Sequence, residues 1–562
     1  MTPNAVPAEV GAAAGSFDPR NGCPASPQSR QGRAVAPPDH AALIGGLLTT
    51  PRRRGTQRLT QPQDRPMTAK AEQWSLRARL GAAFGLGAVM ASGQAPLGFW
   101  GLTLIGLAAL TLLVAREPGR KTAALTGWFG GAGYFALSLS WIFEPFLIDA
   151  ARDGWMAPFA VVLISFGLAL FWALAGFLSA LPTHPARRAL AFATALAAVE
   201  LARGYVLTGF PWALVGHVWV GTWPGQAASL IGPSGLTLMT TLAAALPVAF
   251  RWKGALAGGL ILAAAAGFGW QRLQQPEPEA PGITLRLVQP NADQATKWQP
   301  GMARMLFDRQ LAFTAAAPRP DAVIWPETAV PYLLEDSEGA LVEMAEAAQG
   351  VPVLAGIQRG EGWRFWNSLV VVAADAGVQA VYDKHHLVPF GEYIPFGDTM
   401  DRLFGIRAFA AQQGNGYSEG AGASVLDLGA LGKVLPLICY EAVFPQDLRA
   451  APERADWILQ VTNDAWFGTL TGPYQHLAQA RLRAIEQGLP LVRVANTGVS
   501  ALIDAKGRIL DELPLGAAGY KDVALPGSLP ATPFATLGEF PVLLMLGALA
   551  AGLLLRRRPR QA

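Results

Sequence analysis

Charged residues are scarce in this chain. Of its 562 residues, 44 are Lys or Arg and 40 are Asp or Glu, so that charges make up 15%, against about 25% in soluble domains. Hydrophobic residues reach 51%, with 17 Trp and 26 Phe. The shortage of charge argues against a purely soluble, disordered or fibrous protein and predicts that part of the chain lies in lipid.

Cysteines and the common site motifs are also few. The two cysteines, Cys23 and Cys439, are far apart, which excludes a disulfide-dense secreted scaffold and a Cys-based zinc site. His385 and His386 adjoin without a carboxylate at ligand spacing, and the chain lacks HExxH, GxSxG, Walker A and GxGxxG patterns. We therefore expect no metal and no cofactor, and any cysteine chemistry must use a single thiol.

The basic excess belongs to an N-terminal tail. Residues 1–66 contain eight Arg and four acidic residues, and the remainder of the chain is balanced. Nucleic acid is therefore not an expected partner. The same tail has ten prolines and almost no aromatic residues, so we expect residues 1–74 to form a disordered, basic, Pro-rich extension, with Met67 as a plausible alternative start.

Long stretches with little charge predict membrane helices. Gly81 to Ala115 carries no charge and has Gln94 and Pro96 midway, which favours two helices joined by a tight turn over one long span. A short final apolar segment covers Phe540–Leu555. In total we expect eight transmembrane helices, seven within residues 75–270 and the eighth within 536–562. The remaining predicted spans are residues 122–143, 154–182, 189–208, 226–250 and 254–270.

The distribution of Lys and Arg predicts the orientation, because these residues resist translocation. They gather in alternate loops, which we place in the cytoplasm with both termini. The long region 271–535 then lies outside, in the periplasm of a cell with two membranes. The basic residues concerned are Arg77, Arg79, Arg116, Arg120, Lys121, Arg187, Arg188, Arg251, Lys253, Arg556, Arg557, Arg558 and Arg560.

Residues 271–535 differ from the rest because charges return and short apolar runs alternate with helix-like segments, which predicts a soluble α/β domain. The predicted strands include Ile283–Val288, Ala322–Trp325, Val351–Ile357 and Val434–Cys439. Such a domain between the seventh and eighth helices leaves three classes open: a membrane enzyme, a transporter and a sensor. A transporter would need ionisable residues in mid-membrane that serve its substrate, but Glu200 and Arg203 can pair with each other on one helix face.

Three segments place a reactive side chain at the end of an apolar strand, where α/β sheets often carry functional groups. A-V-I-W-P-E ends in Glu327, Y-D-K-H-H-L-V-P-F-G-E contains Lys384 and Glu392, and V-L-P-L-I-C-Y-E contains Cys439. Singly, each has a structural explanation in packing, capping or solvation. Together, a thiol, a carboxylate and an ammonium supply a nucleophile, a base and a charge stabiliser for acyl transfer through a thioester.

The joint pattern resembles the nitrilase superfamily, whose αββα sandwich carries a Glu-Lys-Cys triad. The position between membrane helices is similar to that in its membrane-embedded family, the apolipoprotein N-acyltransferases, over residues 75–560. The resemblance implies Glu327 as general base, Lys384 as oxyanion-stabilising cation and Cys439 as nucleophile, and it implies supporting roles for Trp298, Glu392, Tyr440 and Glu441. Further matching motifs are Q-P-N-A-D-Q-A-T-K-W at 289–298, N-S-L at 367–369, N-D-A-W-F-G at 463–468 and N-T-G at 496–498.

The resemblance also implies an activity and a location. A fatty acyl chain would move from a phospholipid to the α-amino group of the diacylglyceryl-modified N-terminal cysteine of a lipoprotein, at a multi-pass enzyme of the cell inner membrane. Two alternatives stay open. A membrane-tethered nitrilase-like amidase would use the same triad but let water attack the thioester, and a transporter or sensor would use the external domain only to bind ligand.

Overall fold

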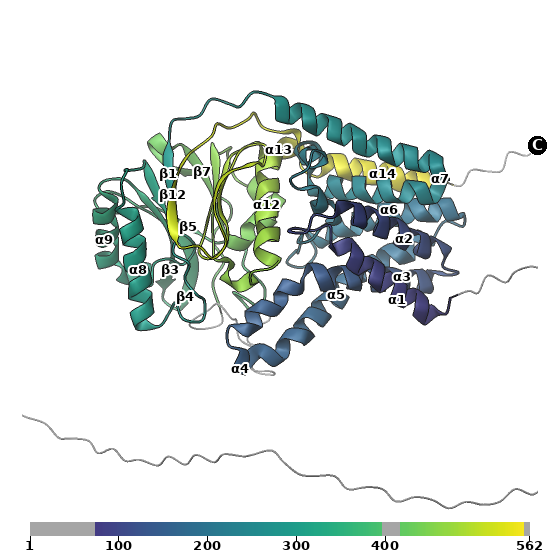
Figure 1. Ribbon diagram of the computed structural model, residues 1–562, viewed down its shortest axis with the longest axis horizontal. Helices are drawn as coiled ribbons and strands as arrows, with labels where there is room; N and C mark the ends of the chain where they lie inside the picture. Colours follow the sequence, from purple (N-terminus) through teal and green to yellow (C-terminus); the bar gives the residue numbers. More distant parts are fainter. Residues whose placement is uncertain (1–73, 396–415, 556–562) are drawn as a thin grey trace, which may run out of the picture. The chain divides into compact units, whose positions relative to one another are not determined.

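The computed structural model describes residues 74–395 and 416–555. The expected disordered extension falls outside the described residues apart from its last position, and so does the Arg cluster after Leu555. Between these limits the chain forms a helical part, an α/β part and a final helix (Figure 1).

The helical part consists of apolar helices that pack along one another (Figure 1). The predicted break near Gln94 is confirmed, because α1 ends at Ala91 and α2 begins at Trp100. The Gln94 amide donates hydrogen bonds to Tyr134 Oη at 2.6 Å and to the Leu214 carbonyl at 3.0 Å. The helices are α1 Leu76–Ala91, α2 Trp100–Arg116, α3 Arg120–Ser138, α4 Ala150–Asp153, α5 Ala157–Ser179, α6 Pro185–Arg203, α7 Ala228–Gln274 and α14 Phe540–Leu554, with 3₁₀ turns η1 Ser140–Leu147, η2 Gly154–Met156, η3 Val215–Trp219 and η4 Pro224–Ala227.

Helix α7 folds back on itself. Arg251 has φ 55°, outside the helical range. The two halves approach so closely that a Cβ added to Gly258 would lie 2.7 Å from the Ala243 carbonyl oxygen, and only glycine permits that contact. The break at Arg251 agrees with the predicted division between residues 226–250 and 254–270.

Only some of the predicted membrane helices are both long and apolar enough to span a bilayer. Among the described residues, two helical stretches are long and apolar enough to cross a membrane, Ala150–Ser179 and Pro224–Gln274, while Trp100–Arg116 and Phe540–Leu554 are apolar but shorter. Helix α6 carries the buried pair of Glu200 and Arg203, whose side chains lie 2.7 Å apart as the sequence predicted. Eight apolar segments are helical, but eight membrane spans are not established.

The α/β part contains two six-stranded sheets within the described residues. Their strand orders are β12-β1-β2-β3-β4-β5 and β11-β10-β9-β8-β7-β6. The first sheet consists of β1 Thr284–Gln289, β2 Ala322–Ile324, β3 Val353–Glu361, β4 Arg364–Val372, β5 Val378–Asp383 and β12 Gly519–Ala524. The second consists of β6 Leu426–Asp427, β7 Lys433–Ile438, β8 Trp457–Thr462, β9 Leu491–Ala495, β10 Ser500–Ile503 and β11 Ile509–Leu513.

Alternating side chains explain why the sheets stack. In β2, Ala322 and Ile324 join the core between the two sheets, while Val323 packs toward α8 and α9. In β7, Ile438 faces the same shared core and Leu437 packs toward α12. Each sheet thus has one face on its partner and one under helices (Figure 1). The helices on these outer faces include α8 Pro300–Thr314, α9 Glu338–Ala348 and α12 Gly472–Gln487, with the short α11 Pro445–Arg449 beside α12. Helix α13 Pro533–Leu537 instead packs against α7 and α12.

The directions of the strands determine which strand ends lie together at one edge of a sheet. Strands β1, β2 and β3 run parallel, and so do β7, β8 and β9. Strand β5 also runs parallel to β3, because both pair antiparallel with β4. The carboxyl ends of β2 and β5 therefore lie at one edge of their sheet.

Candidate active site

The three proposed reactive side chains each follow a strand directly or nearly so. Glu327 comes after β2, Lys384 comes after β5 of the same sheet, and Cys439 comes after β7 of the other sheet. All three are at least 90% buried. Lys384 Nζ lies 3.8 Å from Glu327 Oε1, and both groups act electrostatically on the Cys439 thiol. The two sheets thus bring a carboxylate, an ammonium and a thiol into one buried site.

Glu392 and Asn367 hold the charged pair in place. Lys384 Nζ lies 2.8 Å from Glu392 Oε2, and Glu392 also accepts the Val388 backbone N–H at 2.8 Å. The side-chain amide of Asn367, on β4, donates to Glu327 at 2.7 Å and to Glu392 at 3.1 Å. The ammonium is therefore positioned by one carboxylate and remains near the other.

The second oxygen of Glu327 is held from the opposite sheet. Oε2 accepts the backbone N–H of Asn463, which follows β8, at 2.7 Å. The Asn463 side chain is itself fixed, because its oxygen accepts the Asn496 amide at 2.9 Å. Contacts from both sheets therefore orient the carboxylate before any substrate arrives.

Cys439 has an unusual backbone conformation. Its φ is 51°, a left-handed value that non-glycine residues rarely adopt and that persists only where the surroundings impose it. Strand β7 ends at Ile438 and the 3₁₀ turn η7 Cys439–Val443 begins at the thiol. This sharp strand-to-turn junction sets the thiol at the end of the sheet.

The titration behaviour of the site follows from burial. Burial, followed by the Glu327 charge, raises the pKa of the Cys439 thiol above its usual value, and Lys384 opposes this shift. Burial also raises the pKa of Glu327. Burial alone would lower the pKa of Lys384, but Glu392 and Glu327 raise it overall. The resting site therefore holds a protonated thiol beside a carboxyl group and a charged ammonium.

Glu441 joins the Lys384 loop to the Cys439 turn. This fully buried carboxylate accepts the backbone N–H of Ile438 at 2.7 Å, the backbone N–H of His385 at 2.8 Å and the Tyr382 hydroxyl at 3.0 Å. Burial would raise the pKa of Glu441, but hydrogen bonding and the charge of His385 lower it overall. Glu441 thus fixes the spacing between the ammonium and the thiol.

Tyr440, the residue after Cys439, packs against other aromatic rings. The Tyr440 ring packs edge-on against Phe444, with centroids 4.9 Å apart, and against His386 at 5.7 Å. The Nε2 atom of His386 lies 3.2 Å from the carbonyl oxygen of Thr208 in the helical part. Tyr440 therefore packs where the two parts of the molecule meet.

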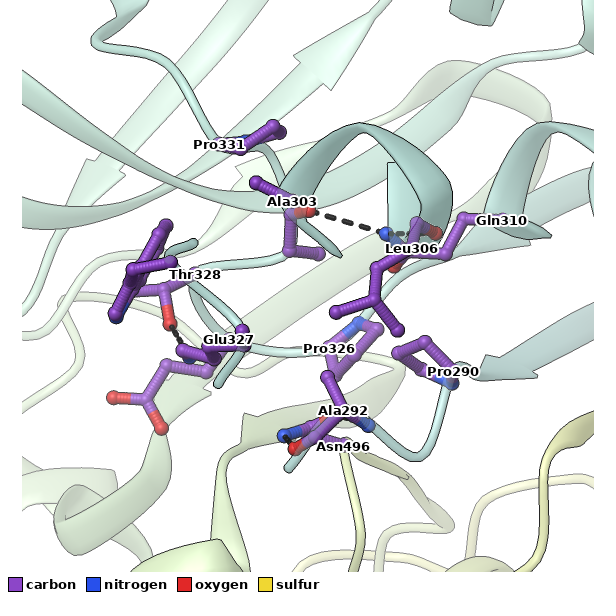
Figure 2. Close-up of a pocket in the computed structure, with 13 residues that line it drawn as sticks. Pro290, Ala292, Ala303, Leu306, Gln310, Pro326, Glu327, Thr328, Pro331 and Asn496 are labelled. Carbon is purple, nitrogen blue, oxygen red and sulfur yellow. Dashed lines mark hydrogen bonds between the residues drawn. The ribbon is translucent and has the colours of Figure 1, made fainter. Parts of the chain in front are cut away.

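Trp298 lines a small cavity of about 30 Å³ together with Lys297 and Glu327. Lys297 is buried, and its Nζ donates to Thr328 Oγ1 at 3.1 Å. Burial lowers the pKa of Lys297 to about 8, against the attraction of Glu327. Figure 2 shows the Glu327 carboxylate pointing away from Leu306, and both residues line the cavity.

Sequence reasoning missed the roles of several polar residues that contact the site. Asn367 and Asn463 open the motifs N-S-L and N-D-A-W-F-G, but their spacing to Glu327 gave no sign of contact. Lys297 stands beside Trp298 and was also overlooked. For Asn367 and Asn463 the available signal was a polar residue inside or directly after a buried apolar strand, which calls for a hydrogen-bonding partner. Lys297 lies in a loop and gave no such signal.

Two family models match the chain. The model of the carbon-nitrogen hydrolases matches residues 285–529, and the model described as the apolipoprotein N-acyltransferase N-terminal domain matches residues 86–246. The α/β part therefore has the nitrilase-like carbon-nitrogen hydrolase fold. Among solved structures, the chain is similar to an amidase from Nesterenkonia sp. AN1 at 18% identity, with 45% of this chain and 94% of that chain covered and a TM-score of 0.32.

Curated relatives cover most of the chain. An apolipoprotein N-acyltransferase from Bradyrhizobium diazoefficiens is 38% identical over 84% of this chain and 94% of its own length. One from Rhodopseudomonas palustris is 37% identical over 84% of this chain and 94% of its own length. One from Caulobacter vibrioides is 40% identical over 75% of this chain and 83% of its own length. The chain thus belongs to the apolipoprotein N-acyltransferase family, and it is an acyltransferase of lipoprotein maturation.

Proposed function

We propose that the enzyme transfers a fatty acyl chain from a phospholipid to the α-amino group of a diacylglyceryl-modified N-terminal cysteine through a thioester on Cys439. The observation that carries this proposal is the buried grouping of Glu327, Lys384 and Cys439 at the ends of strands from two sheets. A thiol with a raised pKa is a poor nucleophile unless a base takes its proton, and Glu327 is the carboxylate placed to do so.

In the acylation step, Glu327 accepts the thiol proton while Cys439 Sγ attacks the ester carbonyl of the phospholipid. The tetrahedral intermediate carries a negative charge on the former carbonyl oxygen, and the Lys384 ammonium stabilises it in a buried site. The ester C–O bond then breaks, and the proton on Glu327 passes to the alcohol oxygen of the leaving lysophospholipid. A thioester remains on Cys439.

In the transfer step, the lipoprotein amine attacks the thioester carbonyl and Glu327 accepts a proton from the attacking nitrogen. The C–S bond breaks, the thiol regains its proton, and the product is an amide. Water would give a free fatty acid instead, which is the amidase outcome. A site buried to this extent limits access of water to the thioester.

We further propose the arrangement in the membrane. Residues 75–270 and 536–562 contribute eight transmembrane helices, residues 271–535 form the periplasmic catalytic domain, and both termini lie in the cytoplasm of a cell with an inner membrane. The alternation of basic loops supports this orientation. Because donor and acceptor are both lipid-anchored, attachment of the catalytic domain to the bilayer at both ends keeps the site near its substrates.

The thioester can be trapped. In a Cys23→Ser background, Cys439 is the sole thiol of the chain. Acyl-labelled phospholipid without acceptor should label the protein, neutral hydroxylamine should release the label, and Cys439→Ala should abolish it. Glu327→Gln should slow labelling by on the order of 10² to 10⁴, the usual contribution of a general base.

The acceptor distinguishes the alternatives. Labelled enzyme should discharge onto a diacylated lipopeptide much faster than onto water. Discharge onto water at an equal rate would instead support the tethered amidase. Labelling that persists in Cys439→Ala would refute the thioester, and a binding domain of a transporter or sensor would then become the better interpretation.

A further inference from the structure

A buried polar cluster that this mechanism does not use lies behind Cys439. Its members are Gln460 of β8, Asp464 of the 3₁₀ turn η8 Asp464–Phe467, His476 of α12 and Arg493 of β9. All four are fully buried. Removing charges from water costs free energy unless every group is paired, and the loss of one partner is then strongly destabilising. Such a cluster holds its members in one arrangement.

The pairing within the cluster is complete around His476. Its Nδ1 lies 3.0 Å from Asp464 Oδ1, and its Nε2 lies 3.0 Å from Gln460 Nε2. Burial and the Arg493 charge lower the pKa of His476, so that the ring is neutral. A proton on Nδ1 satisfies Asp464 and leaves Nε2 to accept from Gln460. Arg493 also donates to Gln460 Oε1 at 2.6 Å and fixes that amide.

The cluster ends on the backbone of the nucleophile. Gln460 Nε2 donates to the carbonyl oxygen of Cys439 at 3.1 Å. His476 contributes indirectly, because its unprotonated Nε2 accepts from the same Gln460 amide and holds it in place. In a planar trans peptide, fixing the Cys439 carbonyl also fixes the opposite direction of the Tyr440 N–H. The cluster thus sets the peptide plane that follows the left-handed Cys439.

The other end of the cluster reaches the helical part of the chain. Trp212, fully buried in the loop between α6 and η3, donates its indole N–H to Gln475 Oε1 at 2.7 Å. Its ring centroid lies 5.6 Å from that of His476, the next residue on α12. Trp212 therefore contacts two consecutive residues of the helix that carries the histidine.

We propose that Trp212, His476 and Gln460 form a positioning relay by which the helical part holds the Cys439 backbone in its reactive conformation. The inference rests on the proposed role of Cys439 as nucleophile. None of the three side chains needs to touch substrate. Their contribution is to keep the thiol and the following peptide plane aligned, so their loss should lower the reactivity of the thiol itself.

The test measures that reactivity directly in the full chain with Cys23→Ser. The rate of Cys439 alkylation by iodoacetamide, a small neutral reagent, is compared with the single-turnover rate of acylation by labelled phospholipid. Trp212→Phe removes the indole N–H and keeps an aromatic ring. We expect both rates to fall about five- to tenfold, as for the loss of one buried hydrogen bond. The matched control is Trp128→Phe, since Trp128 donates to the Phe166 carbonyl at 2.8 Å within the bundle.

A double-mutant cycle tests whether Trp212 acts through the histidine. His476→Gln keeps a polar side chain, and the combination with Trp212→Phe should be less than multiplicative in both rates. A purely structural role would lower the unfolding temperature and leave alkylation of the folded protein unchanged. Rates for Trp212→Phe equal to those for Trp128→Phe, or independent effects in the cycle, would overturn the relay. Cys439→Ala separates the two proposals, because label that persists there refutes the nucleophile rather than the relay.

Discussion

Lys384 pairs more closely with Glu392 than with the proposed base. Its Nζ lies 2.8 Å from Glu392 Oε2 and 3.8 Å from Glu327 Oε1. A buried ammonium needs a carboxylate partner, and Glu392 supplies one without engaging the group that must accept a proton. In the proposed mechanism, Glu392 thereby keeps Lys384 available for an oxyanion and Glu327 available for the thiol.

Loss of this partner should change the chemistry rather than the binding of substrate. In Glu392→Gln, the Lys384 ammonium should move toward Glu327 and lower the basicity of the Glu327 carboxylate. Acylation should then slow on the order of 10²-fold, within the range usual for a general base. Single-turnover labelling by phospholipid measures the rate, and its dependence on phospholipid concentration separates binding from chemistry. Glu346→Gln on the exposed surface of α9 is the control. A change confined to apparent affinity would contradict this assignment.

Loss of the Glu441 carboxylate should lower the stability of the fold. Glu441→Gln places an amide nitrogen or a weaker acceptor where the carboxylate accepts the backbone N–H groups of Ile438, His385 and His386 and the Tyr382 hydroxyl. We expect a loss of about 1 to 3 kcal/mol in the free energy of unfolding, the cost of an unsatisfied buried group. Denaturant unfolding in detergent measures it, with Glu512→Gln on exposed β11 for comparison. Equal stability of the two variants would argue against the bridging role.

Asp464 should confer a particular dependence of stability on pH. Burial would raise the pKa of Asp464, but Arg493 and His476 lower it to about 2, whereas an unfolded Asp has a pKa of about 3.9. A carboxyl group with a depressed folded pKa stabilises above the unfolded value, and that contribution is lost as pH falls from about 4 toward 2. The unfolding temperature measured in detergent between pH 5 and 2.5 should therefore fall with acidification.

The matched variants isolate that contribution. Asp464→Asn should be less stable at pH 5, because Arg493 loses its partner, and should show a flatter decline toward low pH. The exposed Asp336→Asn should keep the wild-type profile. A decline in Asp464→Asn as steep as that of the wild type would assign the pH dependence to other carboxylates.

The proposed orientation predicts the location of fused reporters. Alkaline phosphatase, which is active only outside the cytoplasm, should be active when fused after Gly301 and inactive when fused after Arg251. The physical reason is the excess of Lys and Arg in the loops placed in the cytoplasm. Immunoblotting confirms equal abundance of the fusions. The reverse pattern of activity would invert the topology.

Local patterns in the sequence predicted the strands and marked the candidate reactive residues, because those signals come from a few neighbouring residues. Apolar runs of a few residues predicted β2 and β7 to within two residues, and a reactive side chain directly after such a run marked Glu327 and Cys439. The turn at Gln94 and the break near Arg251 were also local, since each interrupts an apolar stretch with polar, charged or proline residues.

Tertiary structure alone decided which groups orient those residues. The backbone N–H of Asn463 meets Glu327 across 136 positions of sequence, and Trp212 meets Gln475 across 263. No local pattern encodes such contacts, because they depend on how two sheets stack and on where α12 packs against the helical part. The left-handed backbone of Cys439 has the same origin, since its carbonyl oxygen is held by Gln460 of a neighbouring strand, 21 positions further along the chain.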